Sequence, residues 1–198
     1  MNYKFPEIRT IADVLPHIEG RSEFIVAERE FGTVINYMVS MADTFDMTGP
    51  DDIGGAIRRE CRGLIFDTEG RIMSRPFHKF FNVNEREETQ AHLLDFTQEH
   101  TIMTKLDGSF VRPIFYQNRI QWASKMGITH ISEYVDEFLS GAKNIKYNEF
   151  AKWCLNKKIT PIFEFCSKKN KVVIDYEKDR MTLLAVRENI SGKYLKIM

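Results

Sequence analysis

The spacing of apolar residues predicts a chain built mainly from short strands. Between residues 24 and 39, apolar side chains recur on both sides of Gly32, which predicts two strands joined by a turn. Residues 64–67 and 71–77 flank Thr-Glu-Gly at residues 68–70 and predict a second hairpin. Further apolar runs predict strands over residues 101–104, 110–115, 120–123, 160–165, 172–175 and 181–187, with a turn at 189–192 leading into Tyr194.

Helical spacing occurs in fewer places. We expect one short helix over residues 11–16, a helix over residues 87–98 with Leu93, Leu94 and Phe96 facing inward, and two helices over residues 132–139 and 147–156. Turn-forming residues predict an exposed loop over residues 43–55, and residues 58–63 read as a charged turn. Strands outnumber helices and come as hairpins, so the predicted class is α+β, with mainly antiparallel sheets and flanking helices.

Composition places the chain among ordinary globular proteins of one domain. It has 198 residues, of which 43% are hydrophobic and 28% are charged. Lys+Arg and Asp+Glu balance at 28 each, which excludes recognition of a polyanion by bulk positive charge and leaves only a local patch for that purpose.

Cysteine usage and the N-terminus bear on location. The chain has three cysteines, an odd number without metal-ligand spacing, which predicts reduced and mostly buried thiols: Cys61, Cys154 and Cys166. The first residues lack the apolar core of a signal peptide, and no apolar run has the length of a membrane span. We therefore expect a cytoplasmic protein with no membrane partner.

Candidate chemistry centres on Lys105. It would leave the strand predicted at residues 101–104 and enter a turn formed by Asp107 and Gly108. A lysine held there could attack an electrophile such as a nucleotide α-phosphate, provided that desolvation or nearby cations lower its pKa. The alternative is a surface hairpin whose lysine is solvated.

Three other polar groups lie within or at the ends of apolar strands, namely Arg62, Lys79 and Glu164. A carboxylate at Glu164 either faces solvent on an alternating strand or meets a cation or a bound ligand, because burying it alone is costly. The basic run at residues 168–171 is either a solvated turn or a contact for phosphates. Taken alone, the pair Phe80 and Phe81 favours core packing over a platform for stacking bases.

Several motifs follow one another along the chain, at residues 60–66, 74–76, 79–85, 105–109, 124–125, 163–165 and 186–189. In their order and approximate spacing they resemble the RNA ligase 1 family of T4-type bacteriophages, and the similarity extends from about residue 37 to residue 194. The resemblance implies the nucleotidyltransferase (ATP-grasp-like ligase) fold and an ATP-dependent RNA ligase that uses Mg²⁺. In that family a lysine takes AMP from ATP and passes it to a 5′-phosphate RNA end, and a 3′-hydroxyl then seals the strand. The family's link to repair of cleaved tRNA makes tRNA a plausible substrate.

The resemblance also implies roles for individual residues. Lys105 corresponds to the nucleophile, and the residues that correspond to nucleotide-binding positions are Arg62, Lys79, Phe81, Asp107, Gly108, Lys125 and Glu164. The cations Arg62 and Lys79 would hold the nucleotide and its phosphates. Glu164 would lie at the ribose and the lysine. Met126 follows Lys125 where the family usually has glycine, and no residue is assigned to a metal.

The similarity stops before the family's last two nucleotide-binding motifs. No Glu-Gly pair follows Glu164, and Lys193 and Lys196 come too soon after the turn at Asn189 to match the family's lysine pair. The prediction is therefore an adenylyltransferase domain over residues 1–198, truncated before those motifs, acting in the host cytoplasm if a phage encodes it. Two interpretations stay open: an active ligase, and an incomplete nucleotide- or RNA-binding remnant or half of a split ligase whose second polypeptide supplies the motifs. A capping enzyme that uses GTP fits less well.

Overall fold

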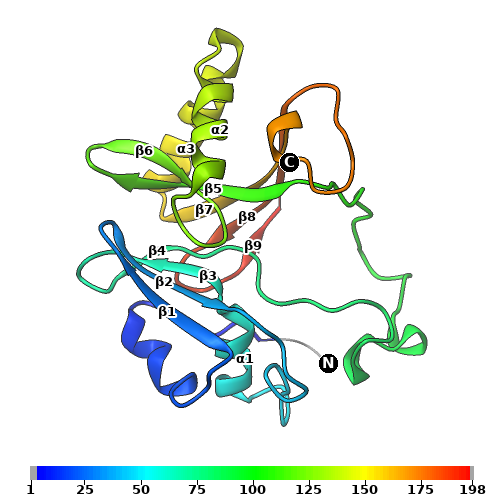
Figure 1. Ribbon diagram of the computed structural model, residues 1–198. Coiled ribbons are helices and arrows are strands. Elements are labelled where there is room, and N and C mark those ends of the chain that lie inside the picture. Colours follow the sequence, from blue (N-terminus) through cyan, green and yellow to red (C-terminus); the bar gives the residue numbers. More distant parts are fainter. Residues whose placement is uncertain (1–3, 197–198) are drawn as a thin grey trace.

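Two antiparallel sheets make up the centre of the molecule in the computed structural model, which describes residues 4–196 (Figure 1). The first sheet has the order β1-β2-β3-β4 and the second the order β6-β5-β7-β8-β9. The strands of the first sheet are β1 (Phe24–Arg29), β2 (Gly32–Tyr37), β3 (Arg62–Phe66) and β4 (Ile72–Ser74). Those of the second are β5 (Ser109–Tyr116), β6 (Arg119–Ala123), β7 (Ile159–Cys166), β8 (Arg180–Glu188) and β9 (Tyr194–Leu195).

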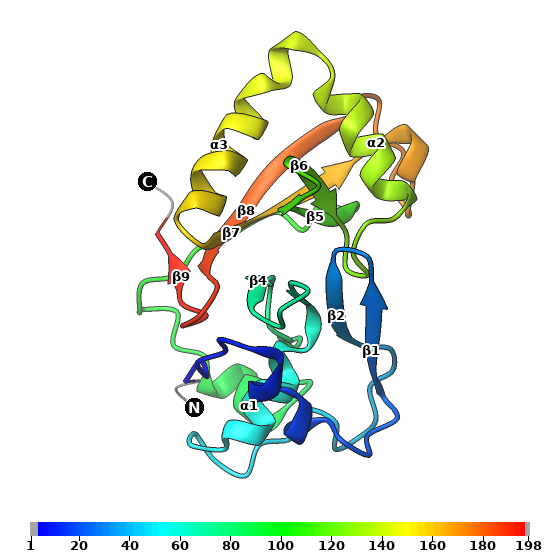
Figure 2. The ribbon, with the colours of Figure 1, turned by 90° about the vertical axis from the view of Figure 1, so that its left-hand side faces the viewer.

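Helices cover the outer face of each sheet, as Figures 1 and 2 show. The helix α1 (Ile53–Glu60) and two 3₁₀ turns (Ile11–Asp13 and Leu15–His17) lie beneath the first sheet, and Ile57 packs there with Leu64 of β3. The helices α2 (His130–Leu139) and α3 (Ile145–Asn156) lie on the second sheet, and their apolar faces pack on Trp122, Phe163 and Phe165. Four further 3₁₀ turns are Glu87–Thr89, Ala91–Leu93, Ala142–Asn144 and Lys168–Asn170.

A third apolar cluster joins the two sheets. Phe31 lies between β1 and β2, and with Val34 and Ile65 of the first sheet it packs on Ile114 and Ala123 of the second. The order of layers is therefore helix, sheet, sheet, helix, and any site between the sheets takes side chains from both. Among the described residues, no helix is long and apolar enough to cross a membrane.

The predicted class is confirmed as α+β with antiparallel sheets. The hairpin around Gly32 is formed by β1 and β2, and the predicted strands at residues 64–67, 110–115, 120–123, 160–165 and 181–187 all exist with ends shifted by a few residues. Both helices of the second half are present, whereas residues 11–16 form 3₁₀ turns. All three cysteines are buried free thiols.

The helix predicted over residues 87–98 is wrong. Only two short 3₁₀ turns form there, and Leu93 and Phe96 remain 58% and 68% exposed, so these apolar side chains are not packed against either sheet. Asp95 also competes with a helix, since its carboxylate accepts hydrogen bonds from the amide and the hydroxyl of Thr97 at 2.9 and 2.6 Å. An apolar pattern without a packing partner does not stabilise a helix.

The strands predicted at residues 101–104 and 172–175 are also wrong, and so is the hairpin turn at Asp107 and Gly108. The first residues of β5 pair with β7 instead, so the segment before β5 has no strand to join. Residues 172–174 form bends, and the amides of Val173 and Ile174 donate to Asp107. Long-range pairing decided both cases, and the local pattern does not contain it.

The exposed loop and charged turn predicted over residues 43–63 contain α1. Asp52 begins this helix, and its carboxylate accepts a hydrogen bond from the Gly55 amide at 2.8 Å, which is an N-cap contact. Gly55 suits the helix for a packing reason, because an added Cβ would lie 2.7 Å from Cγ of Met47. Gly55 therefore allows close packing here rather than forming a turn.

Candidate functional site

A pocket of about 650 Å³ opens between the two sheets. The first sheet contributes Arg62, and the second contributes Glu164 and Tyr194. The second sheet also contributes Phe110 of β5 and Leu184 of β8. The other lining residues come from the connections after β4 and before β5: Phe77, His78, Phe80, Met103, Thr104, Lys105, Leu106 and Gly108. Apolar and aromatic side chains dominate the walls, and a few charged groups converge at one side, which is the usual character of a small-molecule site.

Strand register places Glu164 in this pocket. In β7 it pairs with Phe110 of β5, and its neighbours Phe163 and Phe165 point to the opposite face, beneath α2 and α3. The carboxylate accepts a hydrogen bond from the Gly108 amide at 3.0 Å. Burial raises the pKa of Glu164 despite that hydrogen bond and the nearby Lys105. The carboxylate therefore faces the pocket with Lys105 nearby, but it makes no ion pair within residues 4–196.

Lys105 lines the same pocket from a segment without secondary structure. Its side chain is exposed, and in the part of the chain that the structure describes its ammonium has no hydrogen bond or ion pair. Three residues later, Gly108 crosses β7 so closely that an added Cβ would overlap the carbonyl of Phe165. The close approach of Gly108 to β7 brings the lysine segment to Glu164.

Arg62 begins β3 and supplies a cation with unused hydrogen-bonding capacity. Its guanidinium lies over the Phe80 ring at 4.8 Å and near Phe110 at 6.0 Å. Its Nη1 atom is buried and has no hydrogen-bond partner within residues 4–196. A buried donor without an acceptor is costly, so an anionic ligand oxygen would satisfy it.

Lys79 and Phe81 lie outside the lining of this pocket. Lys79 Nζ donates to the Phe80 carbonyl at 2.9 Å and lies 4.3 Å from the centre of the Phe81 ring. Two arginines also lie over that ring, Arg59 at 5.0 Å and Arg86 at 4.9 Å. Burial, opposed by Glu85, lowers the pKa of Lys79. Three cationic side chains therefore contact the Phe81 ring, and this ring does not line the pocket.

Lys125 lines a second hollow of about 420 Å³ that shares Arg62, Gly108 and Phe110 with the first pocket. Its Nζ donates to the Tyr37 carbonyl at 3.4 Å and lies 4.2 Å from the Tyr37 ring centre. Burial lowers the pKa of Lys125, and repulsion from Arg62 adds to the effect. Asp107 lies beside the pocket, but its carboxylate is taken by backbone amides of the loop before β8.

These positions can be compared with known proteins. A family model for RNA ligases of the T4 type matches residues 60–198. The chain belongs to the T4-type RNA ligase family. It is 32% identical over 188 residues to a Thermovibrio ammonificans protein named "Putative RNA ligase", covering 94% of this chain and 47% of that protein. It is 24% identical over 174 residues to RNA ligase 1 of Bacteriophage TS2126, covering 82% of this chain and 40% of that one. The chain thus spans less than half the length of either relative.

Sequence reasoning missed two polar residues in the pocket of this family member. Nδ1 of His78 lies 2.9 Å from the Tyr194 hydroxyl, and Tyr194 stacks on Phe77 with ring centres 6.0 Å apart. Burial lowers the pKa of His78 to about 4 and raises the pKa of Tyr194. Both are therefore neutral near pH 7, and they extend the apolar wall of the pocket. The one indication of this role in the sequence is that His78 directly precedes Lys79, the first residue of the motif at residues 79–85.

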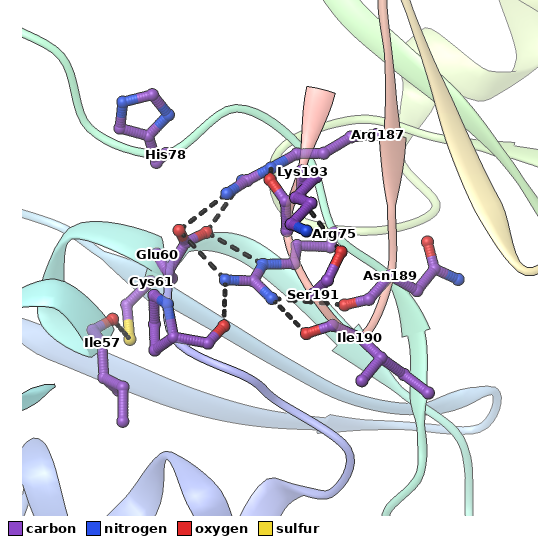
Figure 3. A network of polar contacts seen from close by, with 12 residues as sticks. Ile57, Glu60, Cys61, Arg75, His78, Arg187, Asn189, Ile190, Ser191 and Lys193 are labelled. Carbon is purple, nitrogen blue, oxygen red and sulfur yellow. Dashed lines mark hydrogen bonds and ion pairs between the residues drawn. The ribbon is translucent and has the colours of Figure 1, made fainter. Parts of the chain in front are cut away.

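A buried ionic network behind this wall was also missed (Figure 3). Glu60 at the end of α1, Arg75 after β4 and Arg187 of β8 all have side chains with 0% exposure. Arg187 donates to Glu60 at 2.7 and 2.8 Å, and its guanidinium lies 4.8 Å from the centre of the Tyr194 ring. The network ties the first sheet to the second and supports the aromatic wall.

The described residues do not form a metal site of their own. Residues 4–196 contain no group of three or more His, Cys, Asp or Glu side chains that could hold a metal ion. Glu164 is the one carboxylate among the residues that line the pocket. Any Mg²⁺ here would depend on ligand oxygens that a nucleotide brings, as is common for this ion.

Proposed function

We propose that this chain carries the adenylylating part of an ATP-dependent RNA ligase, with Lys105 as the nucleophile. The observation that carries the proposal is the meeting of Lys105, Glu164 and Arg62 in one pocket with aromatic walls. Such walls suit a purine ring, and the three charged groups in the same pocket suit the sugar and phosphates of a nucleotide.

The charged groups fit a nucleotide in their chemistry. The buried Nη1 of Arg62 requires an acceptor, and a phosphate oxygen is the kind of acceptor that a guanidinium binds best. Lys125 in the adjoining hollow adds a second cation for phosphates of the nucleotide or of an RNA end. Lys79 would act at longer range, through the positive potential that it adds near Arg62, and Phe81 would hold Lys79 in place through its ring.

The proposed step forms one bond and breaks one. After losing a proton, the Lys105 amine attacks the α-phosphorus of ATP; an N–P bond forms, and the P–O bond to pyrophosphate breaks. Glu164 lies in the same pocket and can accept a proton from the ammonium. Mg²⁺ bound to the nucleotide would neutralise charge on the phosphates.

The second and third steps require RNA. The AMP would pass to a 5′-phosphate end, and a 3′-hydroxyl would then displace it to seal the strand. We propose broken tRNA as the substrate class and the cytoplasm as the setting. Because the chain spans less than half the length of its relatives, these steps are proposed for a longer ligase or for this chain with a second polypeptide.

The test is labelling with ATP that carries ³²P at the α position. The protein, Lys105→Ala and the matched variant Lys152→Ala, which changes an exposed lysine of α3, are incubated with Mg²⁺ and ATP. We expect acid-stable label on the wild type and on Lys152→Ala, located at Lys105 by mass spectrometry, and none on Lys105→Ala. A folded wild type without label would refute the proposal, and nucleotide binding by that unlabelled protein would instead point to a binding module.

A further inference from the structure

The lysine segment has few contacts of its own. Residues 101–106 make no hydrogen bond within the described part of the chain, and Ile102 and Met103 are 88% and 59% exposed. The first anchored residues after them are Asp107 and Gly108. The place of the Lys105 backbone therefore depends on the contacts that hold these two residues.

Asp107 is held by the loop between β7 and β8. Its Oδ2 atom accepts hydrogen bonds from the amides of Val173 and Ile174 at 2.7 and 2.6 Å, and its own amide donates to the Tyr176 hydroxyl at 3.0 Å. The contact thus runs in both directions. These amide hydrogen bonds lower the pKa of Asp107, so its carboxylate stays charged.

The loop is itself anchored at both ends. Asn170 donates to Ser109 Oγ at 2.8 Å near its start. Near its end, the Arg180 guanidinium lies 4.7 Å from the centre of the Tyr176 ring, at the first residue of β8. A loop fixed in this way can hold Asp107 at a defined distance from β7 and from Glu164.

We infer that Tyr176 and Asp107 are positioning residues, which fix the Lys105 segment against the loop between β7 and β8. The inference rests on the proposed function, because it assumes that Lys105 reacts. It gives Asp107 a role in place of nucleotide contact, and it assigns a role to Tyr176, which no sequence motif indicated. The Asp107 carboxylate already accepts hydrogen bonds from two backbone amides, and Asp107 is not among the residues that line the pocket.

The test compares Tyr176→Phe and Asp107→Ala with two matched controls. Tyr116→Phe removes a hydroxyl that donates to Glu30 on the β1–β2 turn and accepts from Gln117. Asp67→Ala removes a carboxylate that accepts hydrogen bonds from two amides and from the Arg71 side chain in the β3–β4 turn. Labelling is measured over a range of ATP concentrations. We expect the maximal rate to fall about tenfold for Tyr176→Phe and about a hundredfold for Asp107→Ala, as for an attacking group displaced by about 1 Å.

Further readouts separate positioning from nucleotide contact. In Tyr176→Phe and Asp107→Ala, the ATP concentration at half-saturation should stay the same as in the wild type. Asp107→Asn should recover part of the rate, because its amide keeps an acceptor oxygen. Both controls should match the wild type. Hydrogen exchange without ATP should quicken at the amides of Asp107 and Gly108, which carry the anchoring hydrogen bonds, in Tyr176→Phe, which keeps the ring and should fold normally. Unchanged exchange and rate in Tyr176→Phe, or a loss of ATP affinity alone in Asp107→Ala, would overturn the inference. If even the wild type takes no label, the proposed function fails, and the exchange data still decide whether Tyr176 holds the segment.

Discussion

Replacing Glu60 by glutamine should destabilise the fold more than any surface change. The carboxylate accepts from Arg187 at 2.7 and 2.8 Å, and Arg75 lies at 3.1 Å through both Nε and Nη2. Glutamine has the same shape but no charge, so two guanidiniums would lose the anion that they share in a fully buried space. Breaking a buried ion pair in this way typically costs about 3–5 kcal/mol.

The cost should be near the middle of that range. Both arginines keep carbonyl partners, since Arg75 donates to Ile190 at 2.7 Å and Arg187 donates to Pro76 at 2.6 Å. These hydrogen bonds solvate the guanidiniums in part but do not neutralise them. A loss of about 4 kcal/mol would be a large fraction of the stability of an ordinary domain, which is about 5–15 kcal/mol.

The assay is urea unfolding at pH 7, followed by the fluorescence of Trp122, which is buried in the second sheet. Asp175→Asn serves as the control, because its pair with Lys171 at 3.2 Å is exposed and should contribute less than about 1 kcal/mol. A variant in which Glu60, Arg75 and Arg187 are all replaced by apolar residues should be more stable than Glu60→Gln. A loss below about 1 kcal/mol for Glu60→Gln, or a triple variant weaker than the single one, would refute the reasoning.

Two further predictions concern pH and the pocket. Because burial lowers the pKa of His78 from 6.5 to about 4, the free energy of unfolding should fall by up to about 3 kcal/mol as the pH drops from 6.5 toward 4. In urea unfolding, His78→Gln should reduce this dependence of stability on pH. An unchanged dependence would contradict the role given to His78. Burial raises the pKa of Glu164, so the ionisation of its carboxylate opposes folding once the pH rises above the ordinary pKa of a glutamate. Glu164→Gln should therefore unfold at an equal or higher urea concentration at pH 7.5 while losing the ATP label. A less stable variant would contradict this.

The parts of the fold that depend on alternating apolar residues could be predicted from the sequence. The strands β5 and β7 follow from their composition, and the unusual carboxylate at Glu164 marked one wall of the site. The lysine at Lys105 was also visible, since it precedes an Asp-Gly pair. What the pattern could not give is the pairing of β5 with β7, which removes the partner of the segment before it. Which strands pair across a long stretch of sequence depends on the whole fold, and the local pattern of one strand does not identify its partner.

Other features were hidden because they depend on single long-range polar contacts. The pattern at residues 172–175 resembles a strand, yet the amides of Val173 and Ile174 donate to Asp107, more than sixty residues earlier in the chain. Glu60 lies in a charged run that suggests a solvated turn, although Arg187 neutralises it 127 residues later. A charged residue in a sequence shows that a partner is needed once it is buried, but not which residue supplies it.

Different contacts hold the two sides of the site, and this difference has consequences. The wall with Tyr194 rests on a fully buried ionic network, so it should keep its shape whether or not a ligand is present. The hydrogen bonds that hold the Lys105 segment within residues 4–196 are those of Asp107 and Gly108 near the surface, and an exposed ion pair between Glu99 and Lys196 precedes the segment. Changes to the network should therefore alter stability and nucleotide affinity together, whereas changes at Tyr176 should alter the rate of attack alone. A rigid binding wall with a separately held nucleophile would let the lysine move between ATP and a later acceptor without loss of the pocket.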